Sequence, residues 1–449
     1  MDLGPLPKIG SRPPPEPSQT RRATLRQGAV ALGLVLIVAA VVAFFSTRDG
    51  AGASDSKAAA EDTSYDGTVY IETNDRRRNH NSVLAYRYRA GSLRPLSVRE
   101  YPTGGTGSHD LTNSGALDAE QQIVTNEDRT LLFAVNTGSD TVAVFHIEAD
   151  GGLTPVRGSP FPSRGKAPAS VGVKGDELFV ANKAQDGIRN LDSTPASYAT
   201  FRIASDGSLT PIGVPVKAPA HSSPTQTYIP PHTGNLMIAT EESGPFRAFT
   251  IDAKGNLQQG PNSPLKLDRR VFLPGKPRGN VWAQGLIAHP KLPLIYAGVA
   301  NIKRLVVYEY DATGRLKYVS SQVNKGTILP CWTEISADGT RLYTGNAGSQ
   351  NISVFDISED PRNPRQIQRV TLHGLGLPWN FEIEPTGRYL FMLNMRAVRA
   401  IPPGRGNTLH SFAIGADGKL KELPSSPVQI PVPLGTNPWG LAIVPRAAG

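Results

Sequence analysis

Beyond residue 64, the apolar positions of this chain follow a two-residue period, with no sustained helical periodicity. One block recurs: an apolar strand, a tight turn, a second apolar strand that usually ends in Asn, a short loop, and an alternating third strand. The second strands are TVYIETN, LLFAVN, ELFVAN, LMIATE, LIYAGVAN, RLYTGN and YLFMLN. The third strands are SVLAYRY, TVAVFHI, SYATFRI, PFRAFTI, RLVVYEY, NISVFDI and TLHSFAI. Asp-Gly turns at 150–151, 206–207 and 417–418 lead into short fourth strands.

Blocks of roughly 40–50 residues with about four strands each predict a β-propeller. The first strands start near Gln122, Pro168, Pro224, Trp282, Pro330, Pro378 and Pro438, which again gives seven, but shifted by one block. We therefore expect an all-β, seven-bladed β-propeller over residues 65–446. Its ring closes by pairing Trp439–Val444 with Val69–Thr73, which removes exposed sheet edges.

The segments before the propeller have a different character. Residues 1–27 are basic and rich in proline and are expected to be a disordered tail. Gly28 to Phe45 holds 18 residues without a charge, so 28–46 is expected to be a transmembrane helix or the core of a signal peptide. TRRATLR, at 20–26, resembles a twin-arginine export signal. Residues 47–64 form a polar linker.

The basic residues precede the apolar run, which places the tail in the cytoplasm and the propeller outside it. We expect an extracytoplasmic domain, either anchored in the membrane through residues 28–45 or released into the periplasm or medium after cleavage. Both alternatives stay open at this point.

Charge and cysteine content exclude several function classes. The formal net charge is +9, but the N-terminal segment carries much of the excess, so the propeller has no extended basic face for nucleic acid. Arg76, Arg77 and Arg78 are interpreted as a solvated loop. Cys331 is the only cysteine, which excludes an intrachain disulfide and cysteine-based zinc sites. No cofactor and no dedicated metal site are expected, and the chain is expected to be a monomer.

The stretches SADGTRLYTGNAGSQNISVFDI, LLFAVNTGSDTVAVFHI and NPWGLAIVP resemble the lactonase family of seven-bladed propellers. That family includes propeller-type 6-phosphogluconolactonases and carboxymuconate-lactonising enzymes. The resemblance implies hydrolysis or isomerisation of a small lactone or sugar acid at the channel mouth. Members that act on lactones tend to carry a His-Pro-His type motif. Here, neither His221 nor His289-Pro290 matches its position.

Aligning the seven first strands selects candidate ligand-binding residues. One register is notably polar and holds Gln122, Gln226, Gln284, Trp332 and Asn380. These side chains either border a water-filled channel or bind a small molecule at its mouth. Glu241, which stands where other second strands end in Asn, is a further candidate.

Two residues further along adjacent strands stand Glu334 and Glu382. Neighbouring carboxylates shift each other's pKa, so the pair is the candidate catalytic acid and base. Its oxygens also suit calcium as a weaker alternative. Two functions stay open: a lactonase-type enzyme, and a non-catalytic extracytoplasmic binding propeller.

Overall fold

The computed structural model describes residues 65–108, 119–191, 193–231, 233–242, 244–272, 281–396, 406–433 and 436–446. The predicted tail, apolar segment and linker, 1–27, 28–46 and 47–64, lie outside these residues. Within the described ranges, no helix is long and apolar enough to cross a membrane.

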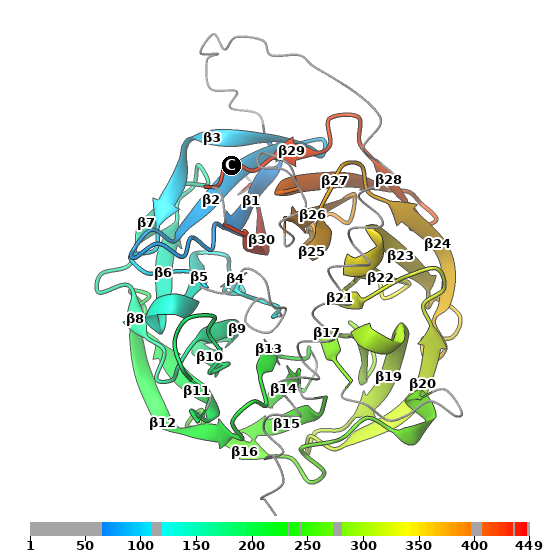
Figure 1. The fold of residues 1–449 in the computed structure, drawn as a ribbon, viewed down its shortest axis with the longest axis horizontal. Helices are drawn as coiled ribbons and strands as arrows, with labels where there is room; N and C mark the ends of the chain where they lie inside the picture. Colours follow the sequence, from blue (N-terminus) through cyan, green and yellow to red (C-terminus); the bar gives the residue numbers. More distant parts are fainter. Residues whose placement is uncertain are drawn as a thin grey trace, which may run out of the picture.

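The described residues form seven antiparallel sheets arranged as blades around a ring, which confirms the predicted propeller (Figure 1). Each blade has an inner, a second, a third and a fourth strand. The inner strands are β4 (Ile123–Thr125), β9 (Pro168–Lys174), β13 (Pro224–Tyr228), β17 (Ala283–Ala288), β21 (Pro330–Ile335), β25 (Leu377–Ile383) and β30 (Trp439–Pro445). They begin within one residue of the predicted positions.

The remaining strands follow the order expected from the repeat. The second strands are β5 (Leu131–Asn136), β10 (Glu177–Asn182), β14 (Leu236–Glu241), β18 (Leu294–Val299), β22 (Arg341–Asn346), β26 (Tyr389–Met395) and β1 (Gly67–Glu72). The third strands are β6 (Thr141–Ile147), β11 (Ala196–Ile203), β15 (Phe246–Ile251), β19 (Arg304–Tyr310), β23 (Asn351–Asp356), β27 (Thr408–Ile414) and β2 (Ser82–Arg89). The fourth strands are β7 (Leu153–Pro155), β12 (Leu209–Ala218), β16 (Leu257–Gln259), β20 (Leu316–Val323), β24 (Arg365–Thr371), β28 (Leu420–Glu422) and β3 (Ser92–Pro102).

Short additional elements complete the blades. Strand β8 (Phe161–Pro162) pairs with β6, and β29 (Val428–Gln429) pairs with β27. Single 3-10 turns occur as η1 (Thr137–Ser139), η2 (Arg269–Val271), η3 (Ala300–Ile302) and η4 (Ala347–Ser349).

The ring closes where its two ends meet, as predicted. Strand β30 pairs with β1 along its whole length, with Val69 opposite Ile443 and Gly67 opposite Pro445. The pairing ends at Glu72, so Thr73 lies just beyond it. The C-terminal strand therefore supplies the inner strand of the blade that begins the domain, and Trp439 within it is fully buried.

In several blades, the asparagine at the end of the second strand bonds to the segment that leads into the inner strand. The Asn182 amide donates to the Ser163 carbonyl (3.2 Å), and the Asn394 amide donates to the Leu375 carbonyl (3.2 Å). Asn346 bonds to the side chains of Asn351 (2.8 Å) and Asn324 (2.9 Å). These asparagines are buried, so their side-chain amides need hydrogen-bond partners. By bonding to nearby chain segments, they also hold those segments in place.

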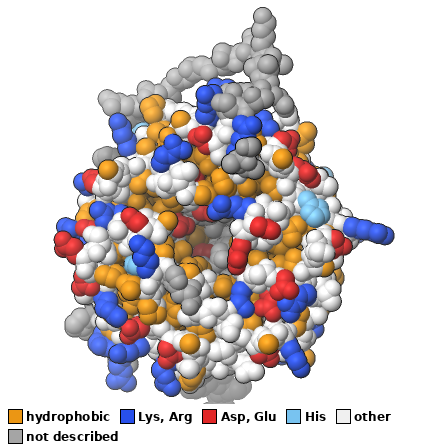
Figure 2. All heavy atoms as spheres, turned by 180° about the vertical axis from the view of Figure 1, so that it is seen from behind, with side chains coloured by type: hydrophobic (Ala, Val, Ile, Leu, Met, Phe, Trp, Pro, Cys, Tyr) orange, Lys and Arg blue, Asp and Glu red, His pale blue; other side chains and the backbone are white. Residues whose placement is uncertain are grey.

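The antiparallel order defines two faces of the ring. Inner strands begin, and second strands end, on the face that we name the upper face. The turns between inner and second strands lie on the opposite, lower face. Figure 2 shows one face of the molecule, hollowed at its centre, with acidic and basic side chains around the hollow.

Candidate functional site

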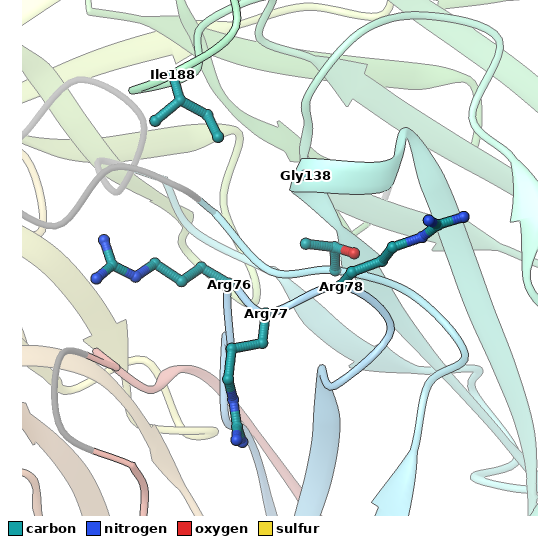
Figure 3. Close-up of a pocket in the computed structure, with 6 residues that line it drawn as sticks. Arg76, Arg77, Arg78, Gly138 and Ile188 are labelled. Atoms are coloured by element: carbon teal, nitrogen blue, oxygen red, sulfur yellow. The ribbon is translucent and has the colours of Figure 1, made fainter.

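The upper face carries a cavity of about 520 Å³. It is lined by Arg76, Arg77, Arg78, Thr106, Gly138 and Ile188 (Figure 3). The three arginines belong to the loop between β1 and β2, and Gly138 lies in η1. The sequence interpretation of this triplet as a plain solvated loop missed the cavity, because its other walls come from separate blades.

The interior of the ring is crossed by the segment that leads into β4, residues 119–122. The Glu120 amide donates to the Thr225 carbonyl of β13 (2.8 Å), and the Val171 amide of β9 donates to the Gln121 carbonyl (2.8 Å). On the other side, the Gly285 amide donates to Glu120 Oε1 (2.9 Å). The Trp332 indole N–H donates to the Ala119 carbonyl (3.4 Å). One segment therefore contacts the inner strands of four other blades.

This crossing gives several of the predicted ligand-binding side chains partners within the chain. Asn380 Nδ2 donates to Gln122 Oε1 (3.0 Å), and the Gly440 amide donates to Asn380 Oδ1 (2.8 Å). Gln226 forms two hydrogen bonds with the backbone of Leu286 in the next blade, at 2.8 and 2.7 Å. In these contacts the polar register joins the inner strands of different blades.

Gln284 differs from the other members of this register. Its side chain is fully buried, and neither its Nε2 nor its Oε1 has a hydrogen-bond partner. Because a buried amide without partners is costly, this side chain is a candidate contact for a small polar molecule.

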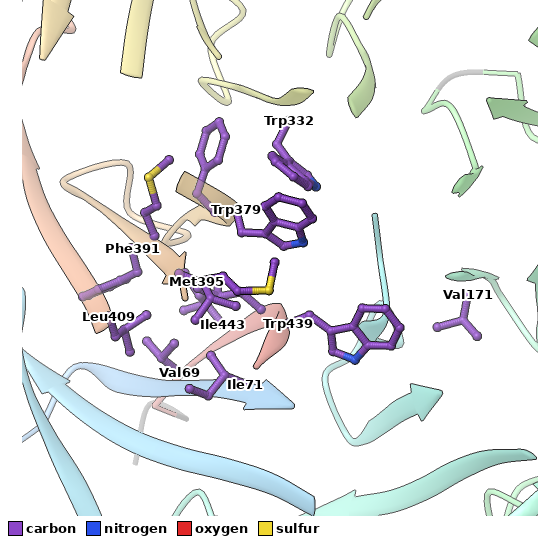
Figure 4. Close-up of a cluster of buried hydrophobic side chains, with 14 of the residues drawn as sticks. Val69, Ile71, Val171, Trp332, Trp379, Phe391, Met395, Leu409, Trp439 and Ile443 are labelled. Atoms are coloured by element: carbon purple, nitrogen blue, oxygen red, sulfur yellow. The ribbon is translucent and has the colours of Figure 1, made fainter. Parts of the chain in front are cut away.

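Two tryptophans from adjacent blades pack against each other in a tilted arrangement. The Trp332 and Trp379 ring centroids are 4.0 Å apart with an interplanar angle of 45°. Both side chains are buried, and Figure 4 shows them beside each other, with Trp439 on the neighbouring strand. Cys331, next to Trp332, is buried.

The two candidate catalytic carboxylates, Glu334 and Glu382, lie on the adjacent inner strands β21 and β25. Each lies near the end of its strand, β21 or β25, and hence toward the lower face, and each is half-buried. Desolvation raises the pKa of Glu334 to about 7. Desolvation also raises the pKa of Glu382 well above its ordinary value, and the charge of Glu334 adds to this rise. One proton can therefore stay on the pair near neutral pH.

The environment of the pair contains one basic group that sequence reasoning missed. The charge of Arg129, which lies in the turn between β4 and β5, acts against the rise in the pKa of Glu382. Glu334 Oε1 accepts a hydrogen bond from the Ile335 amide (3.0 Å), which favours its ionised form. The two carboxyl groups therefore differ in their surroundings, as an acid and a base must.

Glu241 lies in a different environment from the pair. Its Oε1 binds Arg247 Nε and accepts a hydrogen bond from the Tyr198 hydroxyl (3.1 Å). Both Glu241 and Arg247 are buried. Arg247 thus neutralises the carboxylate that replaces the usual asparagine.

The remaining polar groups give no sign of a metal centre. Over the described ranges, no group of three or more His, Cys, Asp or Glu side chains is arranged to hold a metal ion. The calcium alternative for Glu334 and Glu382 stays a prediction. His289 lies in the turn after β17, where its Nδ1 accepts a hydrogen bond from the Lys291 amide (3.0 Å).

The sequence is similar to that of known propeller proteins. The family described as "Lactonase, 7-bladed beta-propeller" matches residues 286–433. The chain is 23% identical over 336 residues to a 6-phosphogluconolactonase of Bacillus subtilis, an alignment that spans 70% of this chain and 85% of that protein.

Solved structures agree on the fold. The periplasmic gluconolactonase of Pseudomonas aeruginosa superposes with a TM-score of 0.61 at 16% identity, covering 84% of this chain and 99% of that one. A protein from Lactobacillus plantarum gives a TM-score of 0.62 at 16% identity, with coverage of 84% and 99%. The seven-bladed architecture is therefore shared at low sequence identity.

Proposed function

Because this chain resembles the lactonase family of seven-bladed propellers in both sequence and fold, we propose that it hydrolyses a small lactone of the sugar-acid type. The observation that carries the proposal is the interacting carboxylate pair, Glu334 and Glu382, with raised pKa values inside the ring. The curated relative from Bacillus subtilis supports the class of substrate.

The pair has the properties that the two proton transfers of lactone opening require. Glu334, with a pKa of about 7, is substantially ionised at neutral pH and accepts a proton from the attacking water. The water oxygen bonds to the lactone carbonyl carbon. Glu382, whose pKa burial raises well above its ordinary value, donates its proton to the ring oxygen as the carbon–oxygen bond breaks. The product is the open hydroxy acid, and one water molecule is consumed.

Other groups in the ring suit a small polar substrate. The unpartnered amide of Gln284 can bind hydroxyl groups, and the packed side chains of Trp332 and Trp379 supply an apolar neighbourhood. No cofactor takes part in this scheme.

The proposed location is extracytoplasmic. It rests on the uncharged run Gly28–Phe45 and on the basic residues before it. Protease added to intact cells is expected to cut the propeller, or the propeller is expected in the medium. A propeller that stays protected inside intact cells would contradict the proposed export.

A second candidate function is a non-catalytic binding propeller. The observation that favours it is the segment 119–122, which occupies the ring interior and uses Gln122 and Asn380 for internal contacts. Under this alternative, the protein binds a small molecule without turning it over.

Hydrolysis of a panel of sugar-acid lactones, followed as acid release by the purified full chain, tests the first function. Glu334→Gln and Glu382→Gln keep the side-chain shape and remove the charge, and Glu359→Gln on the surface is the matched control. Ligand-induced stabilisation by a lactone that is not consumed would favour the binding propeller instead.

A further inference from the structure

The cavity on the upper face has the features of an anion-binding site separate from the carboxylate pair. We propose that it binds a small multivalent oxyanion, a phosphate ester or a polycarboxylate, through Arg76 and Arg78. Figure 3 shows the two side chains extending from the same loop toward different sides of the cavity.

The loop that carries the arginines is fixed by its own hydrogen bonds. Arg77 binds the Asp75 carboxylate through Nη2 (2.6 Å) and Nε (3.0 Å). The Gly107 amide donates to the Asp75 carbonyl (2.8 Å), and the Asn79 amide donates to Thr106 Oγ1 (3.1 Å). The backbone of Arg76 and Arg78 is therefore held in place before any ligand arrives, which lowers the entropic cost of binding.

Arg77 thus stabilises the loop, whereas the side chains of Arg76 and Arg78 are available to bind a ligand. Among the described residues, Arg76 and Arg78 have no hydrogen bond or ion pair. The acidic groups of the adjoining loops already bind other basic side chains. Asp140 pairs with Lys166 (2.8 Å) and Arg189 (2.8 Å). The positive charge of Arg76 and Arg78 is therefore left for a ligand.

The opposite rim of the cavity is also anchored. The Ile188 amide donates to Asp186 Oδ1 (3.0 Å), and Arg189 links Asp186 (2.6 Å) to the Thr137 carbonyl of η1 (2.8 Å). This loop holds the Ile188 side chain 73% exposed at the edge of the cavity. An exposed isoleucine beside guanidinium groups suits a ligand with anionic groups on a small organic body.

The chemistry of the guanidinium group defines the ligand class. Arginine offers planar, paired N–H donors that match phosphate and carboxylate oxygens, and it stays charged at every physiological pH. Two such groups favour a ligand with more than one anionic oxygen pair. Because the cavity lies on the upper face and Glu334 and Glu382 lie toward the lower face, the site is distinct from the proposed catalytic one.

Calorimetric titration of the purified full chain with pyrophosphate and with citrate, at physiological ionic strength, tests the proposal. The Arg76→Gln/Arg78→Gln variant is expected to weaken binding at least about tenfold. Arg94→Gln/Arg99→Gln, on the exposed strand β3, makes the same change in net charge and is expected to leave affinity unchanged. Arg76→Lys/Arg78→Lys keeps the charge, loses the planar fork and is expected to recover part of the affinity.

Each result bears on a separate part of the proposal. Stronger binding of pyrophosphate identifies a phosphate ester, and stronger binding of citrate identifies a polycarboxylate. If Arg76→Gln/Arg78→Gln and Arg94→Gln/Arg99→Gln weaken anion binding equally, the effect is general charge attraction. That result would contradict the proposed site. Failure of the wild-type protein to bind either anion would overturn it as well. Glu334→Gln is expected to bind both anions normally, which keeps this test independent of the proposed lactonase.

Discussion

Glu334 and Glu382 occupy the same register on the adjacent inner strands β21 and β25, and the charge of Glu334 raises the pKa of Glu382. This relationship joins two residues of different blades into one titrating unit. It also makes the protonation of the pair, and the activity proposed for it, dependent on pH near neutrality.

The pH dependence of hydrolysis is the first prediction. Activity is expected to rise as pH increases through about 7, because Glu334 must be ionised to accept a proton from water. It is expected to fall at higher pH, when Glu382 loses the proton that it donates. Rates measured from about pH 5 to about pH 10 should give a bell-shaped profile. A flat profile would count against acid–base catalysis by this pair.

The stability of the folded protein gives a second prediction about the same residue. The pKa of Glu334 is about 7 in the folded protein, against an ordinary value of 4.5 for an exposed glutamate. Stability from burying the neutral carboxyl is therefore complete below pH 4.5 and is lost as pH rises through about 7. Glu334→Gln is expected to stabilise the protein by roughly 1–3 kcal/mol in mildly alkaline buffer and to have little effect in mildly acidic buffer.

Thermal melts of Glu334→Gln across this pH range check the sign. Glu359→Gln, at an exposed position, serves as the control and is expected to show no such pH dependence. An alkaline loss of stability in Glu334→Gln relative to the wild type would contradict the assigned pKa.

Closure of the ring is a third prediction. Truncation after Thr436 removes β30, the whole of its pairing with β1, and the fully buried Trp439. The exposed edge of β1 is then expected to promote unfolding or aggregation. Truncation after Arg446, which keeps the strand, is the control. A melting temperature unchanged by the first truncation would refute the closure.

The buried pair of Glu241 and Arg247 gives a fourth prediction. Removing one partner leaves an uncompensated buried charge, so Arg247→Met is expected to destabilise the protein by about 3–5 kcal/mol. The double variant Glu241→Gln/Arg247→Met removes both charges and is expected to recover much of this loss. Denaturant unfolding of the single and double variants measures the difference. Full additivity of the two changes would show that the residues are not coupled.

The fold could be predicted because each blade repeats the same local pattern. Strand alternation recurs at every blade, and Asp-Gly turns and a terminal asparagine recur at several, so even the closing strand at Trp439 follows from counting. The placement of Glu334 and Glu382 near the same end of adjacent inner strands could be predicted too, since the two residues share one register of the repeat.

The contacts that residues 119–122 make inside the ring could not be predicted in the same way. Ala119 contacts Trp332 across 213 positions, and Glu120 contacts Gly285 across 165. Such contacts depend on one non-repeating segment, for which the other blades offer no template. The only sequence signal is that Glu120, Gln121 and Gln122 place consecutive polar residues directly before an inner strand.

The central claim, that Glu334 and Glu382 open a lactone, is tested most directly by one rate comparison. Acid release from a panel of sugar-acid lactones is measured for the wild-type protein, Glu334→Gln, Glu382→Gln and the surface control Glu359→Gln. We expect the wild type and the control to hydrolyse at least one lactone, and each of the other variants to be slower by about 10²–10⁴-fold. Wild-type activity that survives unchanged in both Glu334→Gln and Glu382→Gln would contradict the account.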